Sequence, residues 1–171
     1  PASRVPMRSH GTLVSAENAV PKNIPSLPYA GLYTSAYLSD HGQLPPKVLG
    51  RYEVLVPLAD SDGMAVAGIR PMPLAVPKAS YTAWNPRAIG FGPGNLFPLQ
   101  GAASPFFLTK SERLSNNDPR LSVEERYASP QAYVELVRQT SQRYVQEGIL
   151  LAEDADRNIE RAKSDTLSQI K

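Results

Sequence analysis

The stretch Arg51-Tyr52-Glu53-Val54-Leu55-Val56-Pro57-Leu58 carries the clearest strand pattern in the chain. Apolar side chains at every second position share one face of an extended segment, which predicts a half-buried strand. The run Asp60-Ser61-Asp62-Gly63 follows with a turn former at each position, and an apolar run resumes from Met64 to Ile69. We therefore predict a β-hairpin over residues 51–69, whose first strand lies at an edge or carries a bulge at Pro57, because proline has no N–H to donate to a ladder.

C-terminal to this hairpin, prolines and aromatic residues dominate. Pro71, Pro73 and Pro77 are expected to break any helix, and residues 79–87 form an aromatic run that we expect to be extended. The glycine-rich run 90–95 lacks the Gly-x-Gly-x-x-Gly order and the lysine of a phosphate-binding loop, so we predict an ordinary loop. Tyr81 and Trp84 either line a ligand pocket or pack beneath these loops.

N-terminal to the hairpin, residues 1–50 are proline-rich and show no sustained period of 2 or 3.6. We expect an irregular strap that lies on a surface supplied by another domain or subunit, because a structureless segment of this length is unusual inside a compact domain. The first residue is proline and no signal-like segment follows it, so we expect the chain to begin partway through a longer product.

The composition changes near Pro105, since 15 of the 17 prolines lie at or before it and 21 of the 34 charged residues lie after it. Ser122-Val123-Glu124-Glu125 has the form of a capping box and predicts a short helix through Tyr127. Ser129 and Pro130 suit the start of a second helix, whose apolar face repeats until Gly148. The pair Glu153-Asp154 predicts a third helix, packed antiparallel on the second through the stripe Ala155, Ile159 and Ala162.

The expected fold class is therefore α+β, in three parts. Residues 1–50 are the proline-rich strap, residues 51–105 hold the β-hairpin with glycine-, proline- and aromatic-rich loops, and residues 106–171 form a helical C-terminal subdomain. The chain has no cysteine, which excludes disulfides and thiolate metal sites and leaves an exported or periplasmic location and a cytoplasmic one equally open. A formal net charge of +2 without a basic stripe argues against nucleic acid, and no apolar run is long enough for a membrane span.

The reactive groups of a serine hydrolase are not recognisable in the sequence, because it contains no Gly-x-Ser-x-Gly elbow. The two histidines, His10 and His41, lie in polar loop sequences and are interpreted as solvated rather than catalytic. They lack the paired spacing of a zinc site, and no later acidic ligand completes a calcium loop after Asp62, so we predict a plain turn, no metal and no cofactor.

Four stretches together resemble the C-terminal region of a family of bacterial α/β-hydrolase-domain proteins, and the likeness spans nearly the whole chain. They are residues 1–6 with 11–14; residues 60–63 with 66–70; residues 76–82 with 84, 85 and 87; and residues 112–114, 118–120 and 122–126 with a helix near Tyr133.

The resemblance implies an esterase-like serine hydrolase whose triad follows the order Ser, Asp or Glu, then His along the chain. The match at residues 1–6 implies that the triad lies upstream, so no residue of this chain is predicted to be catalytic. The region of Tyr81, Trp84 and Arg87 is the candidate for substrate binding, as a wall of the pocket. The predicted partner is the upstream hydrolase core, in the same protein or in a partner subunit.

Two alternatives remain open from the sequence. The chain is a separate binding or assembly subunit that kept a hydrolase-derived scaffold without hydrolysis, or it is an independent enzyme that uses His10 or His41.

Overall fold

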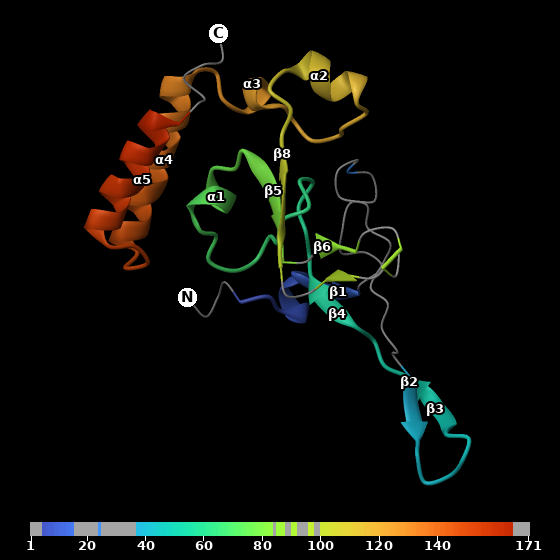
Figure 1. Cartoon of the computed structure of the whole chain (residues 1–171). Helices are drawn as coiled ribbons and strands as arrows, with labels where there is room; N and C mark the ends of the chain where they lie inside the picture. The colour runs from blue at the N-terminus through green and yellow to red at the C-terminus, as the bar shows by residue number, and fades with distance from the viewer. Residues whose placement is uncertain are drawn as a thin grey trace. The chain divides into compact units, whose positions relative to one another are not determined.

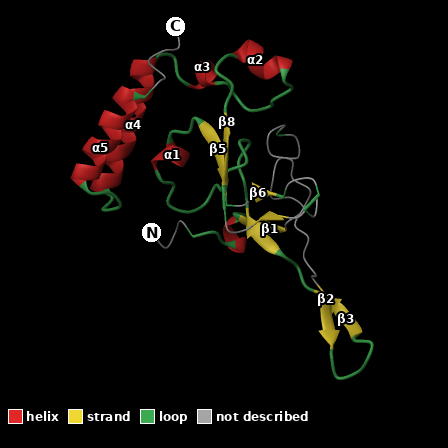
Figure 2. Cartoon of the chain, in the orientation of Figure 1, coloured by secondary structure: helices red, strands yellow, loops and turns green. Residues whose placement is uncertain are grey.

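The computed structural model describes residues 5–15, 24, 37–83, 85–87, 90–91, 96–97 and 100–165. The chain divides into two compact units. Unit 1 comprises Pro1–Lys22, Leu27–Gly68 and Thr82–Ala102, and unit 2 comprises Asn23–Ser26, Ile69–Tyr81 and Ala103–Lys171. Figures 1 and 2 show the elements of the described residues, which mix short strands with helices. In chain order they are η2 (Arg8–His10), β1 (Leu13–Ser15), β2 (Tyr37–Asp40), β3 (Lys47–Arg51), β4 (Leu55–Pro57), α1 (Met72–Ala75), β5 (Ala79–Thr82), β6 (Asn85–Pro86), β7 (Leu96–Phe97), β8 (Ala102–Pro105), α2 (Lys110–Ser115), α3 (Val123–Arg126), α4 (Pro130–Gln146) and α5 (Ala152–Ser164).

The predicted strand over residues 51–58 is shorter than expected, and its partner was wrongly predicted. β4 pairs antiparallel with β1, with Val14 opposite Val56, instead of with residues 64–69. The turn at residues 60–63 forms as predicted, but the two arms beyond it meet only in an isolated bridge between Ala59 and Ala65. The alternating pattern identified an extended face but carried no information about which strand would complete the ladder.

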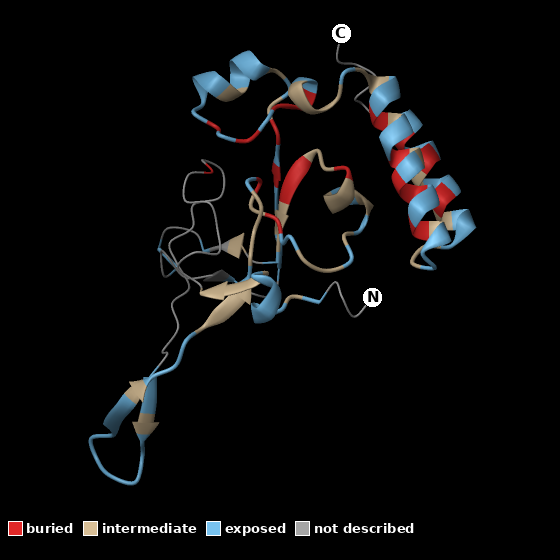
Figure 3. Cartoon of the chain, turned by 180° about the vertical axis from the view of Figure 1, so that it is seen from behind, coloured by how far each residue is buried: buried red, intermediate tan, exposed pale blue. Residues whose placement is uncertain are grey.

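The described part of the first fifty residues includes paired strands, and whether this segment lies on another domain or subunit stays a prediction. β2 and β3 form an antiparallel hairpin with Asp40 opposite Lys47, and the guanidinium of Arg51 lies 4.8 Å from the ring centroid of Tyr37. Figure 3 shows that this hairpin is exposed or half-buried along its length. Its exposed apolar side chains are Tyr37, Leu38, Leu44, Val48 and Leu49.

Unit 2 contains the hydrophobic core of the described residues. Buried Val76, Phe106, Val123, Tyr133, Val137 and Ala162 form one cluster, and Met72, Ala75, Tyr127 and Val134 pack against it. β5 pairs with β8 in a two-stranded sheet beside this cluster. α1 begins in spite of the prolines, because Pro73 occupies the first turn, where a missing N–H costs no helical hydrogen bond.

The three C-terminal helices form as the sequence predicts. Ser122 and Glu125 make the capping box of α3, and the Ser129 side chain accepts the Ala132 N–H at the start of α4. Gly148 follows α4 with a φ of +68°, a conformation that glycine adopts without strain. α4 and α5 lie side by side and antiparallel in Figure 1, and Ala155, Ile159 and Ala162 are buried on α5 as predicted.

The helix α2 was not predicted, although its start carries a capping box. The Thr109 hydroxyl accepts the Glu112 N–H, and the Glu112 carboxylate accepts the Thr109 N–H in return. The helix has no buried residue, so it lacks the apolar periodicity that drew attention to α4. Among the described helices, none is both long and apolar enough to cross a bilayer.

Candidate functional site

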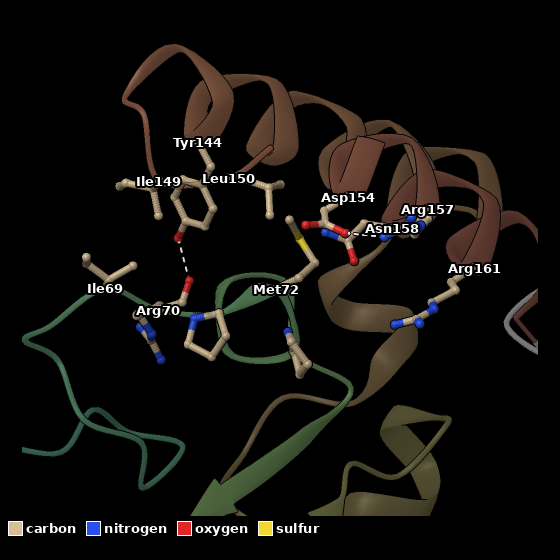
Figure 4. Close-up of a pocket in the computed structure, with 12 residues that line it drawn as sticks. Ile69, Arg70, Met72, Tyr144, Ile149, Leu150, Asp154, Arg157, Asn158 and Arg161 are labelled. Carbon is tan, nitrogen blue, oxygen red and sulfur yellow. Dashed lines mark hydrogen bonds and ion pairs between the residues drawn. The ribbon is translucent and has the colours of Figure 1, made fainter. Parts of the chain in front are cut away.

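A groove in unit 2 lies between residues 69–73 and the helix pair α4–α5, and its volume is about 480 Å³ (Figure 4). Seven of its twelve lining residues are apolar or aromatic, and the other five are charged or polar. The lining residues are Ile69, Arg70, Pro71, Met72, Pro73, Tyr144, Ile149, Leu150, Asp154, Arg157, Asn158 and Arg161. A hollow of this size that combines an apolar wall with a few polar groups is typical of small-molecule sites.

Two tyrosine hydroxyls hold the segment 70–77 against the helices. The Tyr144 hydroxyl donates to the Arg70 carbonyl at 2.7 Å, which Figure 4 shows at one end of the groove. The Tyr127 hydroxyl donates to the Pro77 carbonyl at 2.7 Å. Because both bonds satisfy backbone carbonyls of a short proline-rich segment, they fix the position of the groove wall.

The charges of the groove are unevenly compensated. The Asp154 carboxylate accepts from the Arg157 guanidinium at 2.7 Å, so these two charges offset each other. Arg161 extends from α5 toward α1 in Figure 4, and its side chain makes no hydrogen bond or ion pair to another described residue. The groove therefore presents an excess of positive charge.

A second hollow of about 290 Å³ adjoins the first and shares with it Met72, Pro73, Asn158 and Arg161. Lys78 forms an ion pair with Asp165 here, and the Lys78 ammonium lies 5.8 Å from the Tyr133 ring centroid. Burial, followed by the nearby charge of Asp165, raises the pKa of the Tyr133 hydroxyl to about 12. This hydroxyl therefore stays protonated at neutral pH.

Two of the three predicted substrate-binding residues are described, and they belong to different units. Tyr81 lines the second hollow and is half-buried in unit 2. Arg87 belongs to unit 1, where it is exposed and its guanidinium lies 5.8 Å from the Phe97 ring centroid. Trp84 lies outside the described residues. Their role in substrate binding stays a prediction.

Both histidines are exposed. His10 ends the short helix η2, and His41 follows strand β2. Neither imidazole is hydrogen-bonded to a serine or carboxylate within the described part of the chain. Over the same ranges, no three His, Asp or Glu side chains gather as a metal ion would require.

The carboxylate of Asp60 shapes the turn at residues 60–63. The Asp60 Oδ1 atom accepts from the N–H groups of Asp62 and Met64, each at 3.0 Å. Gly63 has a φ of +82°, as expected where a turn needs a positive φ. The geometry is that of an Asx turn, in agreement with the sequence-based preference for a plain turn.

The buried serines with known partners serve the scaffold. The Ser80 hydroxyl accepts from Arg120 at 2.9 Å, and the Ser122 hydroxyl donates to Glu125 at 2.8 Å. A nucleophilic serine needs a general base within hydrogen-bond reach, and an arginine cannot act as one. Glu125 is a poor base for Ser122, because hydrogen bonding from Arg113 lowers the pKa of its carboxyl to about 2. These contacts give Ser80 and Ser122 structural roles.

A buried ion pair, which the sequence did not reveal, organises the region around β5 and β8. The side chains of Asp118 and Arg120 are 2% and 1% exposed, and their closest N–O distance is 2.6 Å. Arg120 also donates to the Ser104 carbonyl at 3.0 Å and lies 5.2 Å from the Phe106 ring centroid. Burial opposes ionisation of Asp118, but hydrogen bonds from Arg120 outweigh it and lower the pKa of this carboxyl.

The residues of the groove were also missed by sequence reasoning. Asn158 and Arg161 are separated by three positions on α5, a spacing that places them on one face of the helix. They flank the buried stripe of Ile159 and Ala162, so the only available signal was polar residues bordering an apolar face. The segment 69–73 that faces them is remote in sequence.

Comparison with known proteins gives one match. Residues 5–160 match the family model described as an alpha/beta hydrolase domain. No curated protein and no solved structure matches the chain. Because the match extends over most of the sequence, it confirms the resemblance at the level of the family, and the chain belongs to the α/β-hydrolase domain family.

Proposed function

We propose that this chain is the non-catalytic C-terminal portion of an ester-cleaving serine hydrolase of bacterial origin, and that it packs on the core that carries the catalytic triad. One observation carries the proposal: the family match covers residues 5–160, yet the sequence contains no Gly-x-Ser-x-Gly elbow. A serine hydrolase of this family needs its nucleophile on such an elbow. We therefore place the nucleophile in another segment.

The contacts of the described side chains support this division of roles. Ser80 and Ser122 are engaged by Arg120 and Glu125, and the two histidines are exposed. The residue set that makes up a triad is thus not assembled among the described residues.

The exposed apolar surface of unit 1 supports packing on another body. Leu44 is 93% exposed and Leu49 is 63% exposed in the β2–β3 hairpin. A two-stranded hairpin is marginally stable in water unless it packs on something else. We propose that the hydrolase core covers it and that Tyr81, Trp84 and Arg87 contribute to the wall of the substrate pocket.

The test is labelling of the full-length protein with a fluorophosphonate probe, followed by mapping of the modified serine. We expect the label on a serine outside the present 171 residues. A label on any serine of the present sequence would contradict the proposal. Ester hydrolysis by this chain alone, abolished by His10→Ala or His41→Ala, would favour the independent enzyme instead.

The exposed hairpin also favours the second candidate, a binding or assembly subunit without hydrolysis. The two candidates differ in whether the same polypeptide also contains a catalytic core. A Gly-x-Ser-x-Gly segment in the same reading frame supports the hydrolase, and its absence supports the assembly subunit.

A further inference from the structure

We propose that the groove between residues 69–73 and the helix pair α4–α5 binds a small organic anion, a carboxylate attached to an aliphatic tail. This inference does not depend on the proposed ester-cleaving function, because all of the residues that carry it belong to unit 2. The ligand chemistry follows from the apolar and the polar part of the groove wall.

The apolar part of the wall suits the tail. Met72 and Ile69 stand on one side, and Ile149 and Leu150 stand on the other, in the turn between α4 and α5 (Figure 4). The Tyr144 ring forms the end wall, and its hydroxyl is occupied by the Arg70 carbonyl. Covering these side chains with an aliphatic chain removes apolar surface from water, which is the main favourable contribution to binding.

The polar part of the wall suits a single carboxylate. Two acids line the same hollows as Arg161, but Asp154 is paired with Arg157 and Asp165 is paired with Lys78. A guanidinium presents two parallel N–H groups that match a carboxylate in a bidentate arrangement. Asn158, three positions earlier on the same helix face, adds amide donors.

The size and charge of the groove favour a small monoanion over an acidic peptide. Its volume of about 480 Å³ lies within the range of small-molecule pockets. Arg157 is already paired with an acid, so a ligand with several carboxylates would meet fewer unpaired cations than it carries charges. Binding of an acidic peptide in place of an aliphatic acid is accordingly an outcome that contradicts the proposal.

The experiment is a titration of the full chain with octanoate, in which isothermal titration calorimetry measures the affinity and NMR amide chemical shifts locate the site. Octanol, of the same length without charge, and acetate, of the same charge without a tail, are the ligand controls. We expect octanoate to bind more tightly than either, with the shifted amides confined to residues 69–73 and 144–161. Equal binding of octanol, or no binding of octanoate, overturns the proposal.

The matched variants are Arg161→Gln and Arg138→Gln. Arg138 is on α4, does not line the groove, and pairs with Glu135 at 3.3 Å. Loss of a charge-assisted bidentate contact should weaken octanoate binding roughly 10- to 100-fold for Arg161→Gln. Arg138→Gln should bind as the unmodified chain does, and equal weakening in both variants overturns the proposal.

A further variant protects the test against misfolding. Arg161→Lys keeps the positive charge but loses the planar fork, so it should bind octanoate with an intermediate affinity. If Arg161→Gln does not fold, the affinity of Arg161→Lys and the positions of the amides that octanoate shifts decide the result. An affinity of Arg161→Lys equal to that of the unmodified chain, with amide shifts outside the groove, contradicts the assignment.

Discussion

The two units of this chain differ in how their side chains are buried. Among the described residues, unit 1 has one buried apolar side chain, that of Met64. Unit 2 has eleven buried apolar side chains, the first being Ile24 and the last Ala162. The β2–β3 hairpin of unit 1 exposes five large apolar side chains instead. In Figure 3, α4 and α5 carry buried residues along their length, whereas the hairpin is exposed or half-buried throughout.

The ion pairs of the units differ in the same sense. Arg8 and Glu53 of unit 1 lie 3.1 Å apart, but their side chains are 71% and 48% exposed. Asp118 and Arg120 of unit 2 are almost completely buried and make several further hydrogen bonds. Unit 2 is therefore stabilised by its own interior, while the described residues of unit 1 leave apolar surface exposed that another body can cover.

The largest effect is expected where a buried charge loses its partner. Asp118→Ala leaves the Arg120 guanidinium buried without its carboxylate, which should cost unit 2 about 3–5 kcal/mol in unfolding free energy. The matched change Glu53→Ala removes an exposed partner and should cost unit 1 about 0–1 kcal/mol. Hydrogen exchange of amides in α4 and in β4 measures the two costs separately. Equal losses would remove the distinction between the units.

A smaller loss of unfolding free energy is expected when a buried valine is replaced by alanine, with an exposed valine as the matched control. Val137 is 1% exposed in the core cluster, and Val48 is 56% exposed in the hairpin. Val137→Ala removes two buried methyl groups and leaves a cavity, so it should destabilise unit 2 by about 2 kcal/mol. Val48→Ala should stay within about 0.5 kcal/mol when the chain is alone. A larger loss for Val48→Ala would mean that the hairpin is already buried by another surface.

The smallest effect is expected from acid, through Arg113 and Glu125. Hydrogen bonding from Arg113, together with the Ser122 N–H, lowers the pKa of Glu125 from 4.5 to about 2. Since the folded-state pKa is below the unfolded value, this stabilisation is complete above about pH 4.5 and is lost as the pH falls toward 2. Glu125→Gln should flatten this part of the acid profile of α4 hydrogen exchange, and Glu135→Gln, on the exposed side of α4, should not.

The helices could be predicted from the sequence because their signals are local. The capping residues Ser122 and Ser129 lie within one turn of the N–H groups that they serve, and the buried positions of α4 and α5 recur with the helical period. The turn at Asp60 was predictable for the same reason, since its carboxylate bonds the backbone two and four residues later. The family was also recognisable from short motifs.

The candidate site could not be predicted in the same way. Tyr81 was singled out and does line a hollow, but Arg161, Asn158 and Met72 were not. Residues 118–120 were noted as a family motif without any sign that Arg120 would reach Ser80 and Ser104. Side chains that act together here are far apart in the chain, and no local pattern links them.

The helix pair, the turn and the absence of a serine elbow can all be read from the sequence, because each depends on residues within one turn of helix or on a single short motif. Tertiary structure alone decided that β4 pairs with β1, that Asp118 and Arg120 are buried under β5 and β8, and that Arg161 faces the segment 69–73. The physical reason is that strand pairing and side-chain burial depend on contacts between segments that are far apart in the sequence. A local pattern cannot show which of these segments will meet in the folded chain.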